Sequence, residues 1–532
     1  MFCDLRRKLR FTWFNFFQSL DYMVRIGFAS LELADFERVI FGREPLEIEK
    51  STFERVNKSF NFLQEFSKDK IIYGINTGFG PMAQYRIEES EQKTLQYNLI
   101  RSHASGFGSH LSSSYVKASM IARLNTLSLG YSGVNDSAIS VLRDLINNDI
   151  TPLIFEHGGV GASGDLVQLA HLALVMIGEG QVEYKGEVKP TTEVFGQLGI
   201  QPMRVSLREG LAVMNGTSVM TGIGIINSIY AKRAVEWSLM ATIMICEMVD
   251  AYDDYFSPEL NKAKKHIGQQ KVAEIITSHL SESKYIKKRE QQLYRSDVQE
   301  RVMKNKVQEY YSIRCVPQIV GIILETVEEC QRLLVEEVNS ANDNPIVDVE
   351  NNNVFHGGNF HGDYVSFEMD KLKIAITKLS MLAERQLNFL MNPKLNDLLS
   401  PFVNLGKLGL NFGMQGVQFT ATSTTAENQM LSNPMYIHSI PNNNDNQDIV
   451  SMGSNSALCA KKVIDNTFEV LVIELISVVQ ALDYLKKTEG LSPQSKISYS
   501  NIRSVIPQFS KDYPIYQDMQ KLKKYMMANS PF

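Results

Sequence analysis

Apolar residues recur at steps of three and four over two long stretches in the second half of the chain. The first stretch covers residues 364–391 and ends at Asn392-Pro393, and the second covers roughly residues 457–485. This spacing places the apolar side chains on one face of a helix, so we expect two long helices here. The positions that carry the pattern are Val365, Met369, Leu372, Ile376, Leu379, Ala383, Leu387 and Leu390 in the first stretch, and Leu458, Val463, Phe468, Val472, Leu475, Val479 and Leu482 in the second.

A third long helix is predicted after Asn215, where a largely apolar segment reaches residue 249. Lys232, Arg233 and Glu236 interrupt this segment, which is typical of a core helix and not of a membrane span. Long apolar helices of this kind indicate a mainly α-helical protein with a central helix bundle. We expect the faces that do not fit within one monomer to be buried between subunits.

Shorter segments are predicted from the same pattern. Helices are expected over residues 31–41 and 52–66, and a leucine-rich one over 166–177. Residues 71–72 begin like a short strand and lead into a glycine-rich loop. Residues 260–306 are rich in Lys, Glu, Gln and Arg with few large apolar side chains, so we expect a solvated face or a mobile loop there.

Composition and charge narrow the class of protein. The chain has 532 residues, of which 44% are hydrophobic. That is enough for a large core and, by length alone, for two to four domains. The formal net charge is −5. A balance so close to neutral gives no electrostatic reason to expect nucleic acid or an anionic membrane as a partner.

The cysteines and histidines point to neither a disulfide framework nor a metal centre. The five cysteines are scattered without a C-x-x-C motif, so we expect reduced thiols in a cytoplasmic protein. The nine histidines form no H-E-x-x-H pattern and no Cys/His ligand cluster. No metal site is therefore expected.

The first 25 residues differ from the rest of the chain. A basic start, Arg6-Arg7-Lys8, precedes an aromatic run between Phe11 and Phe17. Such a start suggests a signal peptide or a membrane-surface helix. The apolar part is short, however, and polar residues interrupt it without a small-residue cleavage pattern. We expect residues 1–25 to be a disordered extension or the result of a misassigned start codon, with Met23 as a natural start.

The most distinctive chemistry lies in residues 157–165 (HGGVGASGD), where four glycines allow backbone angles that a side chain would forbid. If the chain bends tightly, the Gly164 amide nitrogen can attack the Ala162 carbonyl. Loss of water, including the Ser163 hydroxyl, would leave a five-membered ring with an exocyclic methylidene, a strong electrophile that no side chain supplies. On spacing alone, an ordinary glycine turn capped by Ser163 or Asp165 is the simpler interpretation.

The flanking sequence G-G-V-G-A-S-G-D-L-x-x-L-A-H resembles the signature of the aromatic amino acid ammonia-lyases, the family of histidine, phenylalanine and tyrosine lyases. The resemblance runs from about residue 31 to about 506 and is greatest to bacterial tyrosine ammonia-lyases. It implies that Ala162-Ser163-Gly164 cyclises autocatalytically to methylidene-imidazolone (MIO). It also implies a loop-rich active-site domain over residues 26–215, an ammonia-lyase/fumarase-like helix bundle over 216–532, and a homotetramer with sites at subunit contacts.

The resemblance gives roles to two residues near the triplet. Residues 71–80 (IIYGINTGFG) look like the family's tyrosine loop, which implies that Tyr73 is the catalytic base. A phenol titrates near 10 when unperturbed, so a base of this kind needs a positive or hydrogen-bonding environment. Asn215 is a possible helix N-cap. The resemblance instead places its amide against the oxygen of the prosthetic ring.

A second motif supplies candidates for substrate binding. Residues 308–318 (QEYYSIRCVPQ) match the family's Q-[DE]-x-Y-S-x-R-C-x-P-Q pattern. The match implies that Arg314 binds the carboxylate of an amino acid, with the catalytic Tyr311 and Gln308 beside the ring. Phe360 would position the aromatic ring of the substrate. A structural ion pair for Arg314 and a core position for Phe360 are the alternatives.

Three further positions bear on the substrate. Ser102-His103 matches the Ser-His pair that histidine lyases carry at their selectivity position, and a histidine here suits either an imidazole or a phenol. Glu427 matches an acidic residue that helps hold the substrate in histidine lyases. Gln447 matches the family's N-Q-D-x-V-S element, which contacts the active site. By composition, however, residues 442–448 (NNNDNQD) are also typical of a polar surface loop.

The implied reaction is loss of ammonia from an aromatic L-amino acid, a small molecule, to give an α,β-unsaturated acid. We favour conversion of L-tyrosine to p-coumarate. Ser102-His103 and Glu427 keep the alternative of histidine conversion to urocanate open. An MIO-dependent aminomutase, which returns ammonia to the β-carbon, is a second alternative. The non-enzymatic alternative is an inactive helical scaffold, which would need neither Tyr73 nor Arg314.

Overall fold

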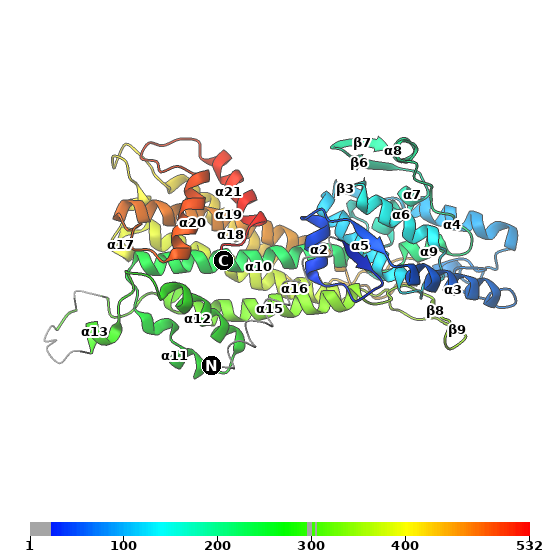
Figure 1. The fold of residues 1–532 in the computed structure, drawn as a ribbon, viewed down its shortest axis with the longest axis horizontal. Helices are drawn as coiled ribbons and strands as arrows, with labels where there is room; N and C mark the ends of the chain where they lie inside the picture. Colours follow the sequence, from blue (N-terminus) through cyan, green and yellow to red (C-terminus); the bar gives the residue numbers. More distant parts are fainter. Residues whose placement is uncertain (1–22, 295–300, 304–305) are drawn as a thin grey trace, which may run out of the picture. The chain divides into compact units, whose positions relative to one another are not determined.

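The computed structural model describes residues 23–294, 301–303 and 306–532, and its fold is mostly helical with a few short strands (Figure 1). This confirms the mainly α-helical fold class expected from the hydrophobic pattern. The predicted extension over residues 1–25 lies outside the described residues except at its end. There, β1 (Val24–Ile26) pairs in parallel with β2 (Leu46–Ile48).

The chain forms two compact units that are built from interleaved segments. Four of the five points at which the chain changes unit fall inside long helices, so the units differ from the continuous ranges 26–215 and 216–532 expected from the sequence. Hydrophobic spacing reveals a helix, but not which neighbours each of its turns packs against. The first unit comprises residues up to 226, 331–367 and 435–458, and the second comprises 227–330, 368–434 and 459–532.

The three long helices predicted from the apolar spacing are confirmed. They are α10 (Ser218–Met248), α16 (Asp363–Met391) and α19 (Gly453–Leu485), and a further long helix is α15 (Val316–Val338). The side chains that carry the predicted pattern in α16 and α19 are buried with few exceptions. Hydrophobic burial on one helix face therefore determines these elements, as the sequence indicates.

The first unit is organised around α5 (Ser113–Ser128), whose residues are nearly all buried. The other strands of this unit form three small antiparallel sheets: β3 (Phe107–His110) with β5 (Phe155–His157); β4 (Thr151–Pro152), β6 (Gln181–Tyr184) and β7 (Glu187–Pro190) in the order β4-β6-β7; and β8 (Ile346–Asp348) with β9 (Asn353–Phe355). The remaining helices of this unit are α2 (Leu33–Ile40), α3 (Lys50–Phe66), η1 (Gly80–Met82), α4 (Glu89–His103), α6 (Asp136–Asn147), α7 (Leu166–Met176), α8 (Thr191–Leu198) and α9 (Glu209–Met214).

Side chains within the second unit join the long helices into a bundle. The Tyr230 ring of α10 meets the Phe468 ring of α19 edge to face at 6.4 Å. Gln386 of α16 donates to Thr242 Oγ1 of α10 at 2.9 Å. The other helices of this unit are η2 (Asp253–Phe256), α11 (Pro258–Lys262), α12 (Ile267–Leu280), α13 (Arg289–Leu293), α14 (Tyr311–Arg314), α17 (Pro393–Asn396), η3 (Pro401–Val403), α18 (Gln415–Leu431), α20 (Pro493–Val505) and α21 (Tyr516–Ala528).

Two local expectations are wrong. Residues 71–72 are not in a strand, because the chain turns after α3 and buries Ile72 and Ile75 in a small core with Leu63. The range 260–306, expected to be a solvated face or a loop, contains the 14-residue helix α12. Polar residues separate the few buried apolar side chains of α12, so the helix does not raise the apolar content of the range 260–306. These side chains are Val272, Ala273, Ile276 and Leu280.

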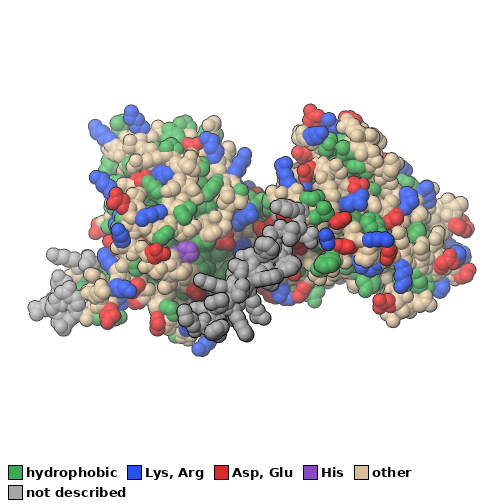
Figure 2. All heavy atoms as spheres, viewed as in Figure 1, with side chains coloured by type: hydrophobic (Ala, Val, Ile, Leu, Met, Phe, Trp, Pro, Cys, Tyr) green, Lys and Arg blue, Asp and Glu red, His purple; other side chains and the backbone are tan. Residues whose placement is uncertain are grey.

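The surface carries charges of both signs, as the near-neutral net charge predicts, and the described cysteines are free, as their spacing predicts. Acidic and basic side chains are interspersed over the face that Figure 2 shows. Among the described residues, no helix has both the length and the apolar character that crossing a membrane requires. The four described cysteines are free thiols, and Cys246 and Cys330 are buried. Burial raises the pKa of both thiols.

A glycine contact in the second unit gives a stability test. A Cβ at Gly321 of α15 would lie 2.5 Å from the backbone nitrogen of Gln269 in α12, whereas a Cβ at Gly196 of α8 would meet nothing within 4 Å. We expect Gly321→Ala to lower the free energy of unfolding by about 1–3 kcal/mol through overpacking. The control Gly196→Ala should leave it unchanged or raise it by up to about 1 kcal/mol. Urea unfolding of both variants measures this, and equal midpoints would contradict the close approach of α12 and α15.

Candidate functional site

The triplet Ala162-Ser163-Gly164 lies between β5 and α7, in a position that only glycine permits at residue 164. Gly164 has a φ of +70°, and a Cβ there would lie 2.0 Å from the Gly216 carbonyl oxygen. The two glycines form an isolated β-bridge, and the Asp165 amide donates to that same oxygen at 2.8 Å. The triplet is therefore held against the turn that precedes α10.

Two side chains from distant parts of the sequence hold Ser163. Asn215 Nδ2 donates to the Ser163 carbonyl oxygen at 3.1 Å, and Gln447 Nε2 donates to Ser163 Oγ at 2.8 Å. The Asn215 Oδ1 atom is buried and has no hydrogen-bond partner among the described residues. Three of the residues named from the sequence thus meet at one point, although 284 positions separate Ser163 from Gln447.

The Asp165 carboxylate joins the loop that carries the triplet to the starts of α10 and α19. Its Oδ2 atom accepts from the amides of Val219, at 2.9 Å, and Met220, at 2.8 Å, in the first turn of α10, and its Oδ1 atom accepts from Ser454 at the start of α19. On spacing alone, the sequence predicts an ordinary glycine turn capped by Ser163 or Asp165. In the structure, the Asp165 side chain caps α10 and makes no cap hydrogen bond to α7. Burial raises the pKa of Asp165 to about 6, although these hydrogen bonds oppose the rise.

A buried arginine lies on the other side of the Gly216 turn. Arg123 of α5 donates to the Ala212 carbonyl at 3.0 Å and to Asn342 Oδ1 at 3.3 Å. A Cβ at Gly216 would lie 2.1 Å from its Nη1 atom. Burial lowers the pKa of Arg123 to about 10. Our sequence interpretation missed Arg123, and the available signal was a single arginine within the otherwise weakly charged run of residues 118–129.

Tyr73 lies in a loop that its own backbone stabilises. The Gly80 amide donates to the Tyr73 hydroxyl at 3.1 Å, and the Tyr73 and Phe79 rings meet edge to face at 6.1 Å. Gly74 has a φ of +76°, and a Cβ there would lie 2.4 Å from Leu211 Cδ2 of α9. The loop therefore packs directly on α9, whose C-cap is Asn215.

One cavity of about 660 Å³ in the first unit brings these groups together. Its walls include seven of the residues named from the sequence: Tyr73, Ser102, His103, Ser163, Asn215, Phe360 and Gln447. They also include residues that the sequence interpretation missed, because these lie in loops or in the short η1, without periodicity: Phe79, Met82, Asn344, His356 and Asn443.

The Leu99 contact of the His103 ring favours one tautomer. Its Nδ1 atom lies 3.0 Å from the Leu99 carbonyl oxygen, one turn earlier in α4. A carbonyl only accepts hydrogen bonds, so Nδ1 carries the proton in the neutral ring. The Nε2 atom is then left as an acceptor. Ser102 Oγ lies 3.0 Å from the same Nδ1 atom, so the Ser-His pair forms one local hydrogen-bonded group at the end of α4.

The other four candidates lie in the second unit. The Arg314 guanidinium lies over the Tyr311 ring at 4.7 Å, and Arg314 Nε is buried without a hydrogen-bond partner among the described residues. Tyr311 itself is 70% exposed, and Gln308 is also exposed. Glu427 of α18 accepts from Asn466 at 2.6 Å. These residues do not line the 660 Å³ cavity, whose walls come entirely from the first unit.

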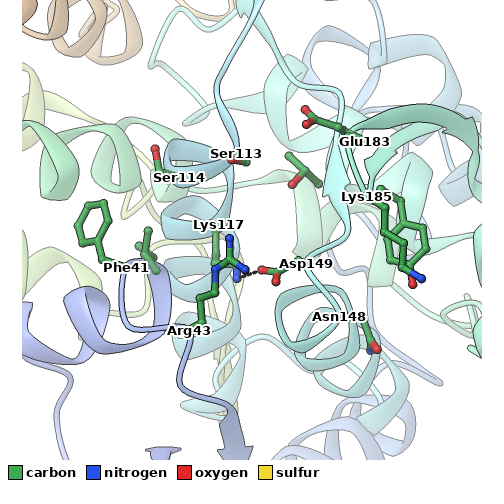
Figure 3. Close-up of a pocket in the computed structure, with 13 residues that line it drawn as sticks. Phe41, Arg43, Ser113, Ser114, Lys117, Asn148, Asp149, Glu183 and Lys185 are labelled. Atoms are coloured by element: carbon green, nitrogen blue, oxygen red, sulfur yellow. Dashed lines mark hydrogen bonds and ion pairs between the residues drawn. The ribbon is translucent and has the colours of Figure 1, made fainter. Parts of the chain in front are cut away.

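A second cavity of about 470 Å³ in the first unit lacks this chemistry. Figure 3 shows residues of its lining, in which Lys117 is paired to Asp149 and Arg43 is a further cation. Glu183 adds a second carboxylate, so charges of both signs line this cavity. None of the residues named from the sequence is among its lining. The cavity around Ser163 is therefore the candidate active site.

The chain is similar to known proteins along most of its length. A sequence model of the family "aromatic amino acid lyase" matches residues 31–504. A tyrosine 2,3-aminomutase from Myxococcus sp. (strain Mx-B0) is 37% identical over 492 residues, covering 91% of this chain and 92% of the relative. A histidine ammonia-lyase from Stigmatella aurantiaca is 39% identical over 448 residues, covering 84% and 85%.

A solved structure agrees with the sequence match. The phenylalanine aminomutase of Pantoea agglomerans aligns with a TM-score of 0.91 at 31% identity, covering 96% of this chain and 100% of its own. The chain belongs to the aromatic amino acid lyase family. It is an enzyme of the ammonia-lyase family that acts on a small amino acid substrate, which sets aside the inactive scaffold considered above.

The buried Asp165 gives a pH-dependent stability test. Its pKa rises from 3.8 to about 6 on folding, so the native state holds a proton through this range that the unfolded state releases. Stability from this group is present below pH 3.8 and is lost as the pH rises through about 6. Asp165→Asn does not titrate. The free energy of unfolding of the variant relative to wild type should therefore increase over this window, by on the order of 2 kcal/mol.

Urea unfolding at a series of pH values measures that difference. Asp149→Asn, at an exposed carboxylate, is the matched control and should show no such trend. A difference between Asp165→Asn and wild type that stays constant across the window would contradict the raised pKa.

Proposed function

We propose that this enzyme eliminates ammonia from an aromatic L-amino acid in the cavity around Ser163, and that L-tyrosine, converted to p-coumarate, is its preferred substrate. The observation that supports this most directly is the position of Ser163. Asn215 and Gln447 hold it in the same cavity that Tyr73 lines. An electrophile formed at Ser163 and a base at Tyr73 would then share one substrate.

We propose that Ala162-Ser163-Gly164 cyclises to MIO, and the local structure fits this group. Cyclisation requires a tight bend and no Cβ at residue 164, and Gly164 has a φ of +70° and no space for a Cβ. The Ser163 carbonyl oxygen would become the ring oxygen, and Asn215 Nδ2 already donates to it at 3.1 Å. The MIO group supplies an electrophile for the amine of the substrate, which makes that amine a better leaving group.

The side chains around Ser163 meet the other demands of the reaction. The β-hydrogen of an amino acid is barely acidic, so a positioned base is needed. Tyr73 would take that proton, and the Gly80 amide fixes its hydroxyl oxygen by a hydrogen bond of 3.1 Å. Asn215 would stabilise negative charge on the ring oxygen. Phe360, on the cavity wall, would position the aromatic ring of the substrate.

The proton position on His103 favours a substrate group that donates a hydrogen bond, such as a phenol, over one that only accepts. With Nδ1 donating to the Leu99 carbonyl, Nε2 offers a lone pair to a donor. The tyrosine hydroxyl is such a donor, and phenylalanine has no group that could use it. Histidine as substrate can also donate, through one ring nitrogen. Glu427, the position that favours histidine, is engaged with Asn466 and lies 3.6 Å from the Lys462 ammonium.

We propose that the substrate carboxylate is bound by Arg314 and that the active enzyme is a homotetramer. The Arg314 Nε atom is buried without a hydrogen-bond partner among the described residues, as expected of a group that pairs with a ligand carboxylate. Arg314, Tyr311, Gln308 and Glu427 all belong to the second unit. In a homotetramer with sites at subunit contacts, these residues would complete a cavity of another subunit.

A tyrosine 2,3-aminomutase is the second candidate. The observation that favours it is the similarity of the chain to the tyrosine 2,3-aminomutase of Myxococcus sp. over 91% of its length. Both reactions begin with removal of ammonia from the α-carbon. The aminomutase returns it to the β-carbon before release, so the two differ in their final product.

The products and the mass of the chain test the proposal. Purified enzyme given L-tyrosine is expected to release p-coumarate and ammonia, and its intact mass should be lower than the sequence mass by two waters. Ser163→Ala should keep the full mass and lose activity by at least about 10³-fold, because the electrophile does not form. Chromatography separates p-coumarate from β-tyrosine, the product of the second candidate. Urocanate formed from histidine alone would overturn the substrate assignment, and an undehydrated wild-type chain would overturn the mechanism.

Tyr73 is tested separately from formation of the electrophile. Tyr73→Phe keeps the edge-to-face contact with Phe79 but removes the hydroxyl, so kcat should fall by about 10²–10⁴-fold. The two-water mass deficit should remain, because Tyr73 is not part of the triplet. Tyr97→Phe, on the same unit, is the control and should retain activity. Near-normal kcat in Tyr73→Phe would assign the base to another residue.

A further inference from the structure

Gln96 occupies a junction between the tyrosine loop and the helix that ends at Asn215. It lies in the middle of α4 and is fully buried. Its Nε2 atom donates to the Gly74 carbonyl oxygen at 3.0 Å, and its Oε1 atom accepts from the Leu211 amide of α9 at 3.0 Å. The buried Gln96 amide donates to the backbone of one segment and accepts from the backbone of another. These two hydrogen bonds fix the distance between the segments.

The two segments that Gln96 joins carry opposite sides of the candidate site. Gly74 directly follows Tyr73. The Leu211 carbonyl accepts from the Asn215 amide at 2.9 Å, and the Asn215 side chain donates to the Ser163 carbonyl. A continuous chain of hydrogen bonds thus runs from the residue beside Tyr73, through Gln96, to the triplet.

Close packing leaves this junction little freedom. A Cβ at Gly74 would lie 2.4 Å from Leu211 Cδ2, and a Cβ at Gly210 would lie 2.9 Å from Gln96 Oε1. The hydrogen bonds of Gln96 therefore act where the Gly74 backbone already packs against the Leu211 side chain and Gly210 packs against Gln96. A change in the Gln96 side chain would shift the tyrosine loop relative to α9 and would not merely leave an unused gap.

We propose that Gln96 is a positioning residue that sets the place of Tyr73 relative to Ser163, so that the hydroxyl of Tyr73 meets the β-proton of the substrate. This inference rests on the proposed function. Gln96 does not line the cavity, so it touches no substrate and acts only through the Gly74 and Leu211 backbones. Displacement of a reacting group by about 1 Å costs about 10²-fold in rate.

Gln96→Met tests the proposal, because methionine has similar volume and neither donates nor accepts a strong hydrogen bond. We expect kcat to fall by about 10²-fold, with KM changed by less than about threefold and with the two-water mass deficit retained. The deuterium isotope effect measured with β-deuterated substrate should be at least as large as in wild type, since proton removal becomes slower.

Gln480→Met is the matched control. Gln480 is also buried, donates to the Phe509 carbonyl at 2.9 Å and accepts from Arg503; it belongs to the second unit and does not line the cavity. The Gln480→Met variant loses comparable hydrogen bonds, so its free energy of unfolding should fall. Its kcat, expressed per chain that has lost two waters, should stay near the wild-type value. Equal kcat in the two variants would overturn the proposal and leave Gln96 as a structural residue.

Gln96→Glu provides a second measurement if the methionine variant does not fold. A protonated carboxyl can donate to the Gly74 carbonyl and accept from the Leu211 amide, whereas a carboxylate only accepts. Activity of this variant relative to wild type should therefore fall as the pH rises, and a flat ratio would count against the proposal. Failure of wild type to lose two waters or to deaminate any amino acid would instead overturn the proposed function itself.

Discussion

The close approach of Gly164 to Gly216 is the constraint on which the rest of the candidate site depends. A side chain at position 164 would collide with the Gly216 carbonyl oxygen at 2.0 Å, and one at Gly216 would collide with Arg123. Two backbones in such contact fix the orientation of the triplet before any side chain contributes. Asn215 precedes one of these glycines, so its amide reaches the Ser163 carbonyl without further adjustment.

The starts of two long helices, α10 and α19, are also tied to the triplet loop. The first amides of α10 have no partners within the helix, and the Asp165 carboxylate accepts two of them. The same carboxylate accepts from Ser454, where α19 begins. The residue that follows the triplet therefore joins the starts of two long helices. Its burial carries an energetic cost, which the raised pKa expresses, and these hydrogen bonds offset part of that cost.

The chemistry that the family membership implies is divided between the two units. The first unit holds the triplet, Asn215, Gln447 and Tyr73 around one cavity. The second unit holds Arg314, with a buried nitrogen that lacks a partner among the described residues, and the exposed Tyr311. Under the function that we propose, the first unit would form the electrophile and position the base, and Arg314 of the second unit would bind the substrate carboxylate. We propose that a homotetramer brings these groups together.

The sequence by itself determined the long helices and the family, because both depend on local patterns. Apolar spacing specified α10, α16 and α19, and the glycine-rich signature around Ser163 led to the family that the comparisons confirm. It did not reveal α12, whose few apolar positions stand among charged residues, or the turn at Ile72. Only the tertiary structure decided that Gln447 contacts Ser163, that Asp165 caps α10, and that Gln96 joins Gly74 to Leu211. These contacts link residues far apart in the chain through single hydrogen bonds, and such bonds leave no periodic trace in the sequence.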